Sequence, residues 1–288
     1  MKKLPLGQPP ISAYLFHAYP LSILAQEDRY LPWFYSTYIQ LFLFPGEELK
    51  FYTHPYCTHH QIRHLYLQTC PLLEARSIER KTLAPTPSGL GVWIRDAIER
   101  KCYVQIDVDF FHLPNRPQYQ RRHFIHEILV SGYDPVTQTF LCSGFDQRGQ
   151  YTTTALPCAI LERALAWTKE YHIQQALNSG ERLSPWFAAA MEDRPSIFLY
   201  KYLRDQYCLL DLASMGEYLE DYLEERDTSA RQHSLAKPRS GGTWGLGIYA
   251  ALQQHLEEAK DGNASFSPII WRILSEHKTT MQSRLAFL

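Results

Sequence analysis

The sequence lacks an excess of charge of either sign and any long apolar segment. Its 288 residues carry 29 Lys and Arg against 30 Asp and Glu, for a formal net charge of −1. This balance gives no electrostatic reason to bind nucleic acid or an anionic membrane. The most apolar run, residues 39–44, is far shorter than the roughly 18 residues that suggest a membrane span. The opening MKKLPLGQPP breaks at proline before an apolar core forms, so we expect no signal peptide.

Cysteine motifs are missing as well. The six cysteines, at 57, 70, 102, 142, 158 and 208, contain no CxxC pair and no spacing typical of a disulfide framework. We therefore expect reduced thiols in a cytoplasmic protein. The segment 54–64 is rich in histidine, but it has neither a second Cys and His cluster nor nearby carboxylates. A surface or interface histidine cluster is favoured there, and no metal or other cofactor is predicted.

The middle of the chain carries the clearest secondary-structure signals. Residues 89–100 have helical periodicity after a candidate N-cap at Ser88. Clean alternation of apolar and polar residues predicts a strand over 103–111. Two further strands are expected over 123–134, with apolar residues on both faces, and over 140–145, followed by a DQRG turn. In the first strand, Asp107 is expected to face solvent and Asp109 to cap the loop that follows.

The ends of the chain are predicted to be mostly helical. Helices are expected over residues 33–44, after Pro157, over 197–210 and 213–225, and in two final segments beyond a polar, basic loop at 226–242. A change of character near residues 179–185 predicts two domains, residues 1–180 and residues 181–288, the second of them helical.

A spaced set of residues in the middle of the chain resembles the butirosin biosynthesis protein H family, which belongs with the papain-like peptidases. The set comprises Asp109, Leu113-Pro114, Tyr119, His123, His126 and Gly132-Tyr133-Asp134. The resemblance covers about thirty residues well and implies a papain-like α+β fold for the first domain. It also implies transfer of an acyl or aminoacyl group from a carrier-protein thioester to an amine, in nonribosomal peptide or related antibiotic biosynthesis. In this pattern His126 takes the place of the general base.

The chain departs from the family pattern at the nucleophile. The family places Cys after His near the start of an early helix, and the counterpart here is His17-Ala18. Three explanations remain open: a naturally inactive relative, an engineered replacement at Ala18 that traps a complex, or a nucleophile at Ser22 one helical turn later. The nearest candidate for the orienting acid is Asp146, although Asp before Gln-Arg-Gly is also ordinary turn chemistry.

These residues define the predicted site. His126, Asp146 and Ser22 are the catalytic candidates, and the substrate is expected to contact His17, Ala18, Asp109, Tyr119 and His123. The expected partners are an acyl or peptidyl carrier protein and a small-molecule amine. A second hypothesis, motivated by the missing cysteine, is a non-catalytic protein that binds a carrier protein or a synthetase domain. Peptide-bond hydrolysis is a weaker third, because it needs the same nucleophile.

Overall fold

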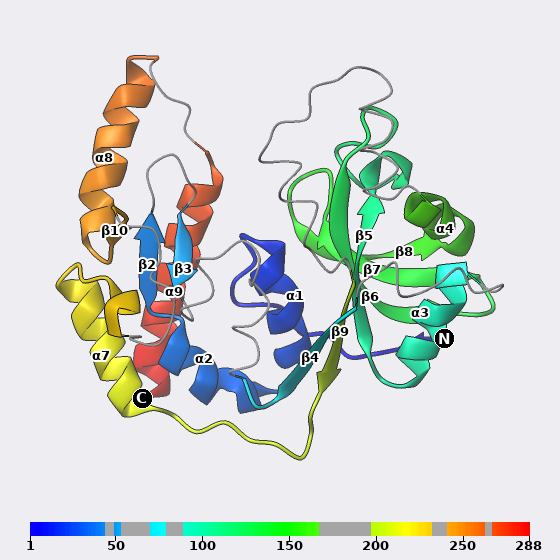
Figure 1. Ribbon diagram of the computed structural model, residues 1–288, viewed down its shortest axis with the longest axis horizontal. Helices are drawn as coiled ribbons and strands as arrows, with labels where there is room; N and C mark the ends of the chain where they lie inside the picture. Colours follow the sequence, from blue (N-terminus) through cyan, green and yellow to red (C-terminus); the bar gives the residue numbers. More distant parts are fainter. Residues whose placement is uncertain (44–48, 53–69, 79–88, 167–196, 232–240, 263–266) are drawn as a thin grey trace. The chain divides into compact units, whose positions relative to one another are not determined.

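The computed structural model describes residues 1–43, 49–52, 70–78, 89–166, 197–231, 241–262 and 267–288 (Figure 1). The chain is mixed α+β and forms two compact units that interleave along the sequence. The sheet unit comprises residues 1–8, 18–26 and 73–204, and the helical unit comprises residues 9–17, 27–72 and 205–288. This division differs from the expected split into 1–180 and 181–288, whose boundary itself lies outside the described residues. Contacts between distant segments, rather than chain order, define the units.

The sheet unit is built on a seven-stranded antiparallel sheet with strand order β4-β9-β5-β6-β7-β8, in which the short β1 pairs with β6. Its strands are β1 (Lys2–Lys3), β4 (Leu73–Ile78), β5 (Tyr103–Asp109), β6 (Ile125–Asp134), β7 (Thr139–Phe145), β8 (Tyr151–Pro157) and β9 (Ile197–Tyr202). Its helices are α1 (Leu15–Leu24, from residue 18 on), α3 (Gly89–Glu99), α4 (Cys158–Ala166) and the short η5 (Phe110–His112). Figure 1 shows α1 on one side of this sheet and α3 and α4 on the other.

The predicted strands at 103–111, 123–134 and 140–145 are confirmed, with ends shifted by one or two residues. The prediction that Asp107 faces solvent is wrong, because all seven residues of β5 are buried and Asp107 is only 9% exposed. β5 is a central strand, between β6 and β9, and both of its faces are covered. A polar residue on such a strand needs an interior partner, as when Gln105 accepts a 2.8 Å hydrogen bond from the Tyr200 hydroxyl.

The segment 197–210 was predicted to be helical, and this is wrong, because none of its residues lies in a helix. Residues 197–202 form β9, which pairs with β4 on one side and with β5 on the other. Its sequence, IFLYKY, is rich in residues that favour strands, and hydrogen bonds to two neighbouring strands outweigh its weak helical periodicity. A strand from the second half of the chain therefore lies beside the strand that carries Asp109.

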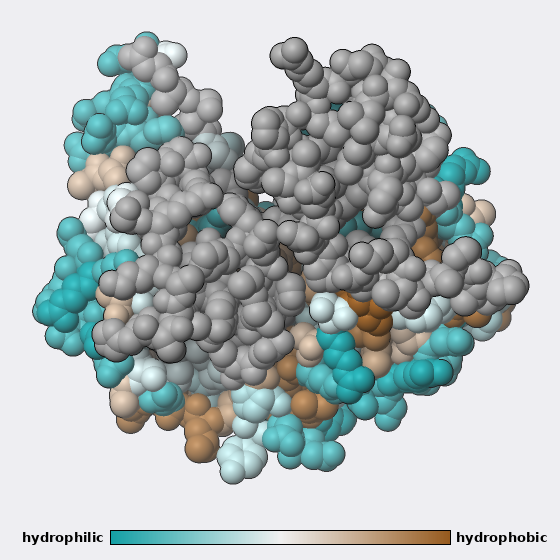
Figure 2. All heavy atoms as spheres, in the orientation of Figure 1, coloured by the Kyte–Doolittle hydropathy of each residue, from teal (hydrophilic) through white to brown (hydrophobic). Residues whose placement is uncertain are grey.

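The helical unit contains a three-stranded sheet of order β10-β2-β3, with β2 (Gln40–Leu43), β3 (Lys50–Tyr52) and β10 (Thr243–Trp244). Its helices are η1 (Asp28–Tyr30), α2 (Leu31–Thr37), α7 (Leu212–Leu223), η6 (Thr228–Arg231), α8 (Gly247–Lys260) and α9 (Ile269–Phe287). The side of α7 and α8 visible in Figure 2 is largely hydrophilic. The expected helix over 33–44 is therefore only partly right. Tyr38 leaves the helical region of backbone space, and the chain continues as β2.

The last helix anchors this turn from helix to strand. Arg284 donates to the backbone carbonyls of Tyr35 and Tyr38 at 2.8 and 2.7 Å, and His277, two turns earlier, donates to that of Ile39 at 2.8 Å. Both side chains are buried. A cation at the C-terminal end of α2 satisfies carbonyls that lack helical partners and complements the helix dipole. Among the described residues, no helix is both long enough and apolar enough to cross a membrane.

Several sequence predictions fall wholly or partly outside the described residues. They are the Ser88 cap, the histidine-rich segment 54–64, the helix beyond Ala166 and the greater part of the loop 226–242. The described start of that loop is ordered by η6, and Arg231 makes a two-pronged ion pair with the buried Asp221, at 2.7 and 2.8 Å. This part of the predicted loop is therefore structured rather than mobile.

Candidate functional site

The candidate site begins where β5 ends, at Asp109. The side chain of Asp109 is fully buried, and its Oδ1 accepts hydrogen bonds from the backbone N–H groups of Phe111 and Phe124, each at 3.0 Å. The first of these caps η5, which confirms the capping role predicted for Asp109. The second ties the entry of β6 to the exit of β5. Two backbone donors therefore fix the carboxylate and leave its other oxygen, Oδ2, for side-chain partners.

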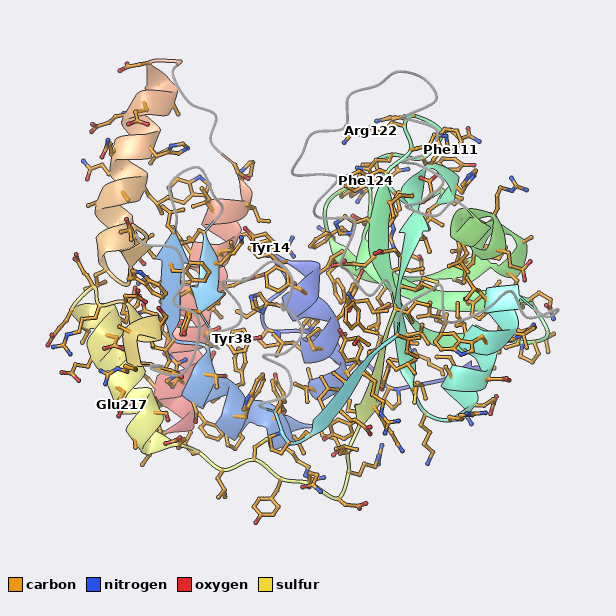
Figure 3. The ribbon with its side chains drawn as sticks, in the orientation of Figure 1. Tyr14, Tyr38, Phe111, Arg122, Phe124 and Glu217 are labelled. Carbon is orange, nitrogen blue, oxygen red and sulfur yellow. The ribbon has the colours of Figure 1, made fainter. Side chains whose placement is uncertain are left out.

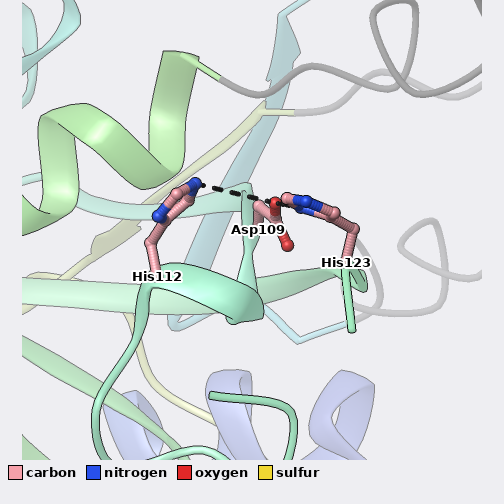
Figure 4. Close-up of side chains that lie close together, drawn as sticks. All are labelled: Asp109, His112 and His123. Carbon is pink, nitrogen blue, oxygen red and sulfur yellow. Dashed lines mark hydrogen bonds and ion pairs between the residues drawn. The ribbon is translucent and has the colours of Figure 1, made fainter. Parts of the chain in front are cut away.

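Two histidines approach that second oxygen (Figure 4). The Nδ1 atom of His123 lies 2.5 Å from Asp109 Oδ2, and the Nε2 atom of His112 lies 3.9 Å from the same oxygen. The ring of Phe111 stacks on His123 with centroids 4.3 Å apart and meets His112 edge-on at 5.1 Å. The side chain of His123 is 31% exposed and that of His112 is 14% exposed. A fully buried carboxylate thus orients an imidazole that solvent can reach.

The short Asp109–His123 contact indicates which nitrogen of the His123 imidazole carries the proton. Because a carboxylate only accepts hydrogen bonds, the proton lies on Nδ1 of His123, and Nε2 is the basic nitrogen. The same arrangement of carboxylate, imidazole Nδ1 and basic Nε2 orients the general base in many hydrolases and transferases. Burial lowers the pKa of the neighbouring His112, and the charge of Asp109 opposes that shift without reversing it.

His126 lies on the opposite face of the sheet from Asp109. In the β5–β6 register His126 is directly opposite Val108, whereas Asp109 is opposite Ile125. Side chains on a strand alternate between faces, and directly opposed residues share one. His126 therefore points to the side of Phe110 and Phe124, with ring centroids 5.4 Å from each. Its Nδ1 accepts a 3.0 Å hydrogen bond from the N–H of Glu127.

The helix α1 packs on the Asp109 side of the sheet. Tyr103 shares a face with Asp109 on β5, and its hydroxyl is hydrogen-bonded by Gln26, just beyond the end of α1. That hydroxyl also donates to the carbonyl of Pro5, in the segment that runs alongside α1. The end of α1 is thereby fixed on the face of the sheet that carries Tyr103.

A second set of contacts leads to the same face. The hydroxyl of Ser22 on α1 is 3.1 Å from that of Tyr151, which also bonds Ser143. Ser143 is opposite Leu129 on β6, and Leu129 shares its face with Ile125. Ser22 of α1, Ser143 and Leu129 therefore lie on one side of the sheet.

Tyr19 connects α1 directly to β6. Pairing between β6 and β7 stops at Leu129 and Ser143, so the carbonyl of Glu127 has no strand partner on that side. The buried Tyr19 hydroxyl donates to this carbonyl at 2.8 Å, and the Arg116 guanidinium similarly reaches the carbonyl of Phe145 on β7. Burial raises the pKa of Tyr19 well above its usual value, so its hydroxyl remains a donor. The residue after Ala18 is thus held against the strand that His123 precedes.

The other predicted site residues have structural surroundings. Ser22 is fully buried and donates to the carbonyl of Tyr19 at 2.8 Å, and Ala18 is fully buried in the same helix. His17 belongs to the helical unit, where its Nδ1 lies 3.1 Å from the Tyr38 hydroxyl. Among the predicted site residues, the structure brings together Asp109 and His123.

Asp146 and Tyr119 lie outside this pair. Asp146 accepts hydrogen bonds from the N–H groups of Arg148 and Gln150, which lower its pKa and close the turn between β7 and β8. The turn role considered for Asp146 is therefore confirmed. The hydroxyl of Tyr119 accepts a 3.2 Å hydrogen bond from its neighbour Gln120.

His112 was missed by sequence reasoning. Its signal was present, as Asp109 and His112 are three residues apart at a strand end, the spacing of a single turn. What the sequence does not reveal is that the loop 113–122 returns His123 to the same carboxylate. No protein-family model matches the chain, and the curated proteins include no significant match.

Proposed function

We propose that this protein transfers an acyl group from a carrier-protein thioester to an amine, with His123 as the general base. The observation that carries the proposal is the hydrogen bond between His123 Nδ1 and the buried Asp109 Oδ2 at 2.5 Å. It fixes the tautomer and the orientation of a ring whose side chain is 31% exposed. A positioned base of this kind contributes about 10²–10⁴ in rate to a proton-transfer step.

Aminolysis of a thioester needs a base but no enzyme nucleophile. His123 Nε2 would take a proton from the attacking amine as the new C–N bond forms. The tetrahedral intermediate would then lose the carrier's thiolate as the C–S bond breaks, and the proton would pass from His123 to that sulfur. The negative charge of Asp109 stabilises the intervening imidazolium. Direct transfer needs no nucleophile at position 18. It is therefore consistent with Ala18, which takes the place of the family's cysteine but cannot form an acyl-enzyme.

The fold proposed for the sheet unit is papain-like. Support comes from α1, which packs on one face of an antiparallel sheet and is bonded through Tyr19 to β6. The resemblance implies that the early helix packs against the strand that carries the histidine. The base role predicted for His126 stays a prediction, but the contact of His123 with a buried carboxylate favours His123 instead.

The surroundings of His123 suit an acidic carrier protein. Arg121 and Arg122, immediately before His123, are exposed, and the Arg122 guanidinium lies over the ring of Phe124 at 5.6 Å (Figure 3). Exposed cations at a docking surface steer an acidic partner and set its orientation. Arg226 and Arg231, in the loop first considered for this role, are already engaged with acidic side chains of their own unit.

A second candidate function is non-catalytic binding of a carrier protein or synthetase domain. The full burial of Ala18 and of the Ser22 hydroxyl favours it, since neither offers a nucleophile. The two candidates differ in one respect: only the first consumes a thioester.

The experiment compares two histidine variants in a transfer assay. A carrier protein loaded with an acetyl or aminoacyl group is incubated with the full chain and a panel of primary amines, and loss of thioester and formation of amide are followed by mass spectrometry. We expect turnover by the natural sequence, a loss of about 100-fold or more in His123→Gln, and near-normal rates in His126→Gln. The opposite ranking would return the base role to His126. Binding of the carrier without any turnover would support the second candidate.

A further inference from the structure

We propose that Asp109, His112 and His123 form a binding site for a divalent transition metal of the zinc class. One ligand atom from each of the three side chains lies within 4.8 Å of the other two. Two imidazoles and one carboxylate are the donor set that suits Zn²⁺, Co²⁺ or Fe²⁺, whereas Mg²⁺ and Ca²⁺ favour sites made of oxygen atoms alone. This inference does not rest on the proposed function.

The distances between the donor atoms are close to those of a metal site. Asp109 Oδ2 is 2.5 Å from His123 Nδ1 and 3.9 Å from His112 Nε2. Metal–ligand bonds of about 2.0–2.2 Å in tetrahedral geometry separate the ligand atoms by roughly 3.3 Å. The first pair would move apart and the second would close, each by less than roughly one ångström on this geometry. The third pair, between the donor nitrogens of the two histidines, lies within 4.8 Å and would also close.

Neighbouring groups hold the three donor side chains in place for a metal ion. Asp109 Oδ1 is held by the N–H groups of Phe111 and Phe124, so Oδ2 points at the two histidines without freedom to turn away. Hydrogen bonds of this kind to a ligating carboxylate position it for the metal. The ring of Phe111 packs against both imidazoles and forms an apolar wall on one side. The exposure of His123 leaves access from solvent on another.

Three protein ligands leave at least one coordination position for water or substrate. This number is typical of catalytic rather than structural zinc sites. In the proposed geometry the metal replaces the proton between Asp109 Oδ2 and His123 Nδ1. Metal binding and the hydrogen-bonded Asp109–His123 pair would therefore exclude one another, and the metal would act on this site as an alternative occupant.

The test must separate this site from the histidine-rich segment 54–64. We therefore specify the full chain with His54, His59, His60 and His64 replaced by Asn and Cys57 by Ser. Co²⁺ is the probe, because its visible absorption reports both binding and a low coordination number, and Zn²⁺ competition then gives the zinc affinity. We expect one equivalent to bind with the intense bands of a four- or five-coordinate nitrogen and oxygen site.

Single substitutions in that background decide which residues bind. His112→Gln, His123→Gln and Asp109→Asn should each weaken Co²⁺ binding by about 100-fold or more, at the upper end of what changes around a metal site cause. Asp109→Asn keeps an oxygen for the two backbone donors and so preserves the turn. His126→Gln is the matched control, since His126 follows His123 by three residues and lies on the opposite face of the sheet from Asp109, and this variant should bind normally. Circular dichroism and thermal unfolding without metal verify that each variant is folded.

The outcomes are distinct from those of the transfer assay. Absence of Co²⁺ binding in the background variant, or unchanged affinity in folded His112→Gln, would overturn the metal site. Transfer is measured separately, with a chelator present, so its failure bears on the proposed function alone. Co²⁺ binding without transfer, or transfer without Co²⁺ binding, would each retain one proposal and remove the other.

Discussion

The Nδ1 atom of His123 lies 2.5 Å from Oδ2 of Asp109, although the two residues are 14 positions apart in the chain. Asp109 ends β5, and His123 directly precedes the residues that enter β6. Since β5 and β6 are antiparallel neighbours, the loop between them returns the histidine to the carboxylate. Every proposal about this site depends on that one contact.

The charge of Asp109 is expected to matter for transfer. Asp109→Asn keeps an acceptor for the N–H groups of Phe111 and Phe124 but removes the negative partner of His123. We expect kcat to fall by about 10²–10⁴-fold, with a stable fold, because an amide can also favour the wrong imidazole tautomer. Asp146→Asn, in an exposed turn, is the matched control and should leave kcat nearly unchanged. Equal losses in both variants would contradict the assignment.

Ala18→Cys is expected to create an acyl-enzyme if α1 occupies the place of the nucleophile helix. The thiol would be introduced one residue before Tyr19, whose hydroxyl is bonded to β6. After incubation with an acylated carrier protein, intact-mass measurement should show the mass of the acyl group added to the variant. Ser22→Cys serves as the control, since position 22 is one turn further along the helix. If position 22 is acylated and position 18 is not, the registration of α1 with the family pattern is wrong.

Ser22 is expected to contribute to stability rather than chemistry. Its buried hydroxyl donates to the Tyr19 carbonyl at 2.8 Å and lies 3.1 Å from the Tyr151 hydroxyl. Ser22→Ala removes both bonds and should lower the free energy of unfolding by about 1–3 kcal/mol. Urea unfolding measures this loss, and the transfer assay should show retained activity. Complete loss of transfer in a folded Ser22→Ala variant would revive the serine mechanism.

His277 is expected to make the helical unit less stable in acid. Burial lowers its pKa to about 4, while the hydrogen bond to Ile39 acts in the other direction. The unfolded chain takes up the proton near 6.5 and the folded chain does not, so stability is full above pH 6.5 and declines as the pH falls toward 4. The decline amounts to roughly 3 kcal/mol.

His277→Gln isolates this effect, because glutamine can donate to the Ile39 carbonyl but does not titrate. The variant should lose less stability between pH 6.5 and 4 than the natural sequence. The quantity to compare is the stability that each protein loses on acidification. Burial also lowers the pKa of His112, but His112 contributes equally to both proteins. Parallel curves for the two proteins would exclude His277 as the source.

Arg284 is expected to be essential for the junction of α2 and β2. It is buried, and burial lowers its pKa to about 10, so it remains charged at neutral pH. Arg284→Met would leave the carbonyls of Tyr35 and Tyr38 without these donors and should cost roughly 2–4 kcal/mol of unfolding free energy. Arg284→Lys keeps the charge but not the planar pair of donors, so we expect an intermediate loss in chemical denaturation. A neutral effect of both substitutions would contradict the capping role.

Clean alternation in the sequence was sufficient to predict β5, because a strand in a sheet repeats every two residues, and short apolar runs bounded by turn residues predicted β6 and β7. The helix at 89–99 followed in the same way from its 3.6-residue period. The capping role of Asp109 was also readable, since a carboxylate at the end of a strand accepts from the next turn. These features depend on neighbours in the chain, and local chemistry decides them.

Only the tertiary structure decided which residues share the site. The register of β5 and β6 placed Asp109 and His126 on opposite faces and brought His123 and His112 to the carboxylate. Pairing of β9 between β4 and β5 made a strand of an expected helix, and it placed Asp107 on a central strand of the sheet. The sequence alone supplied the histidines and the aspartate, with their approximate positions on strands and loops. Their partners depended on pairing between distant segments, which local periodicity does not encode.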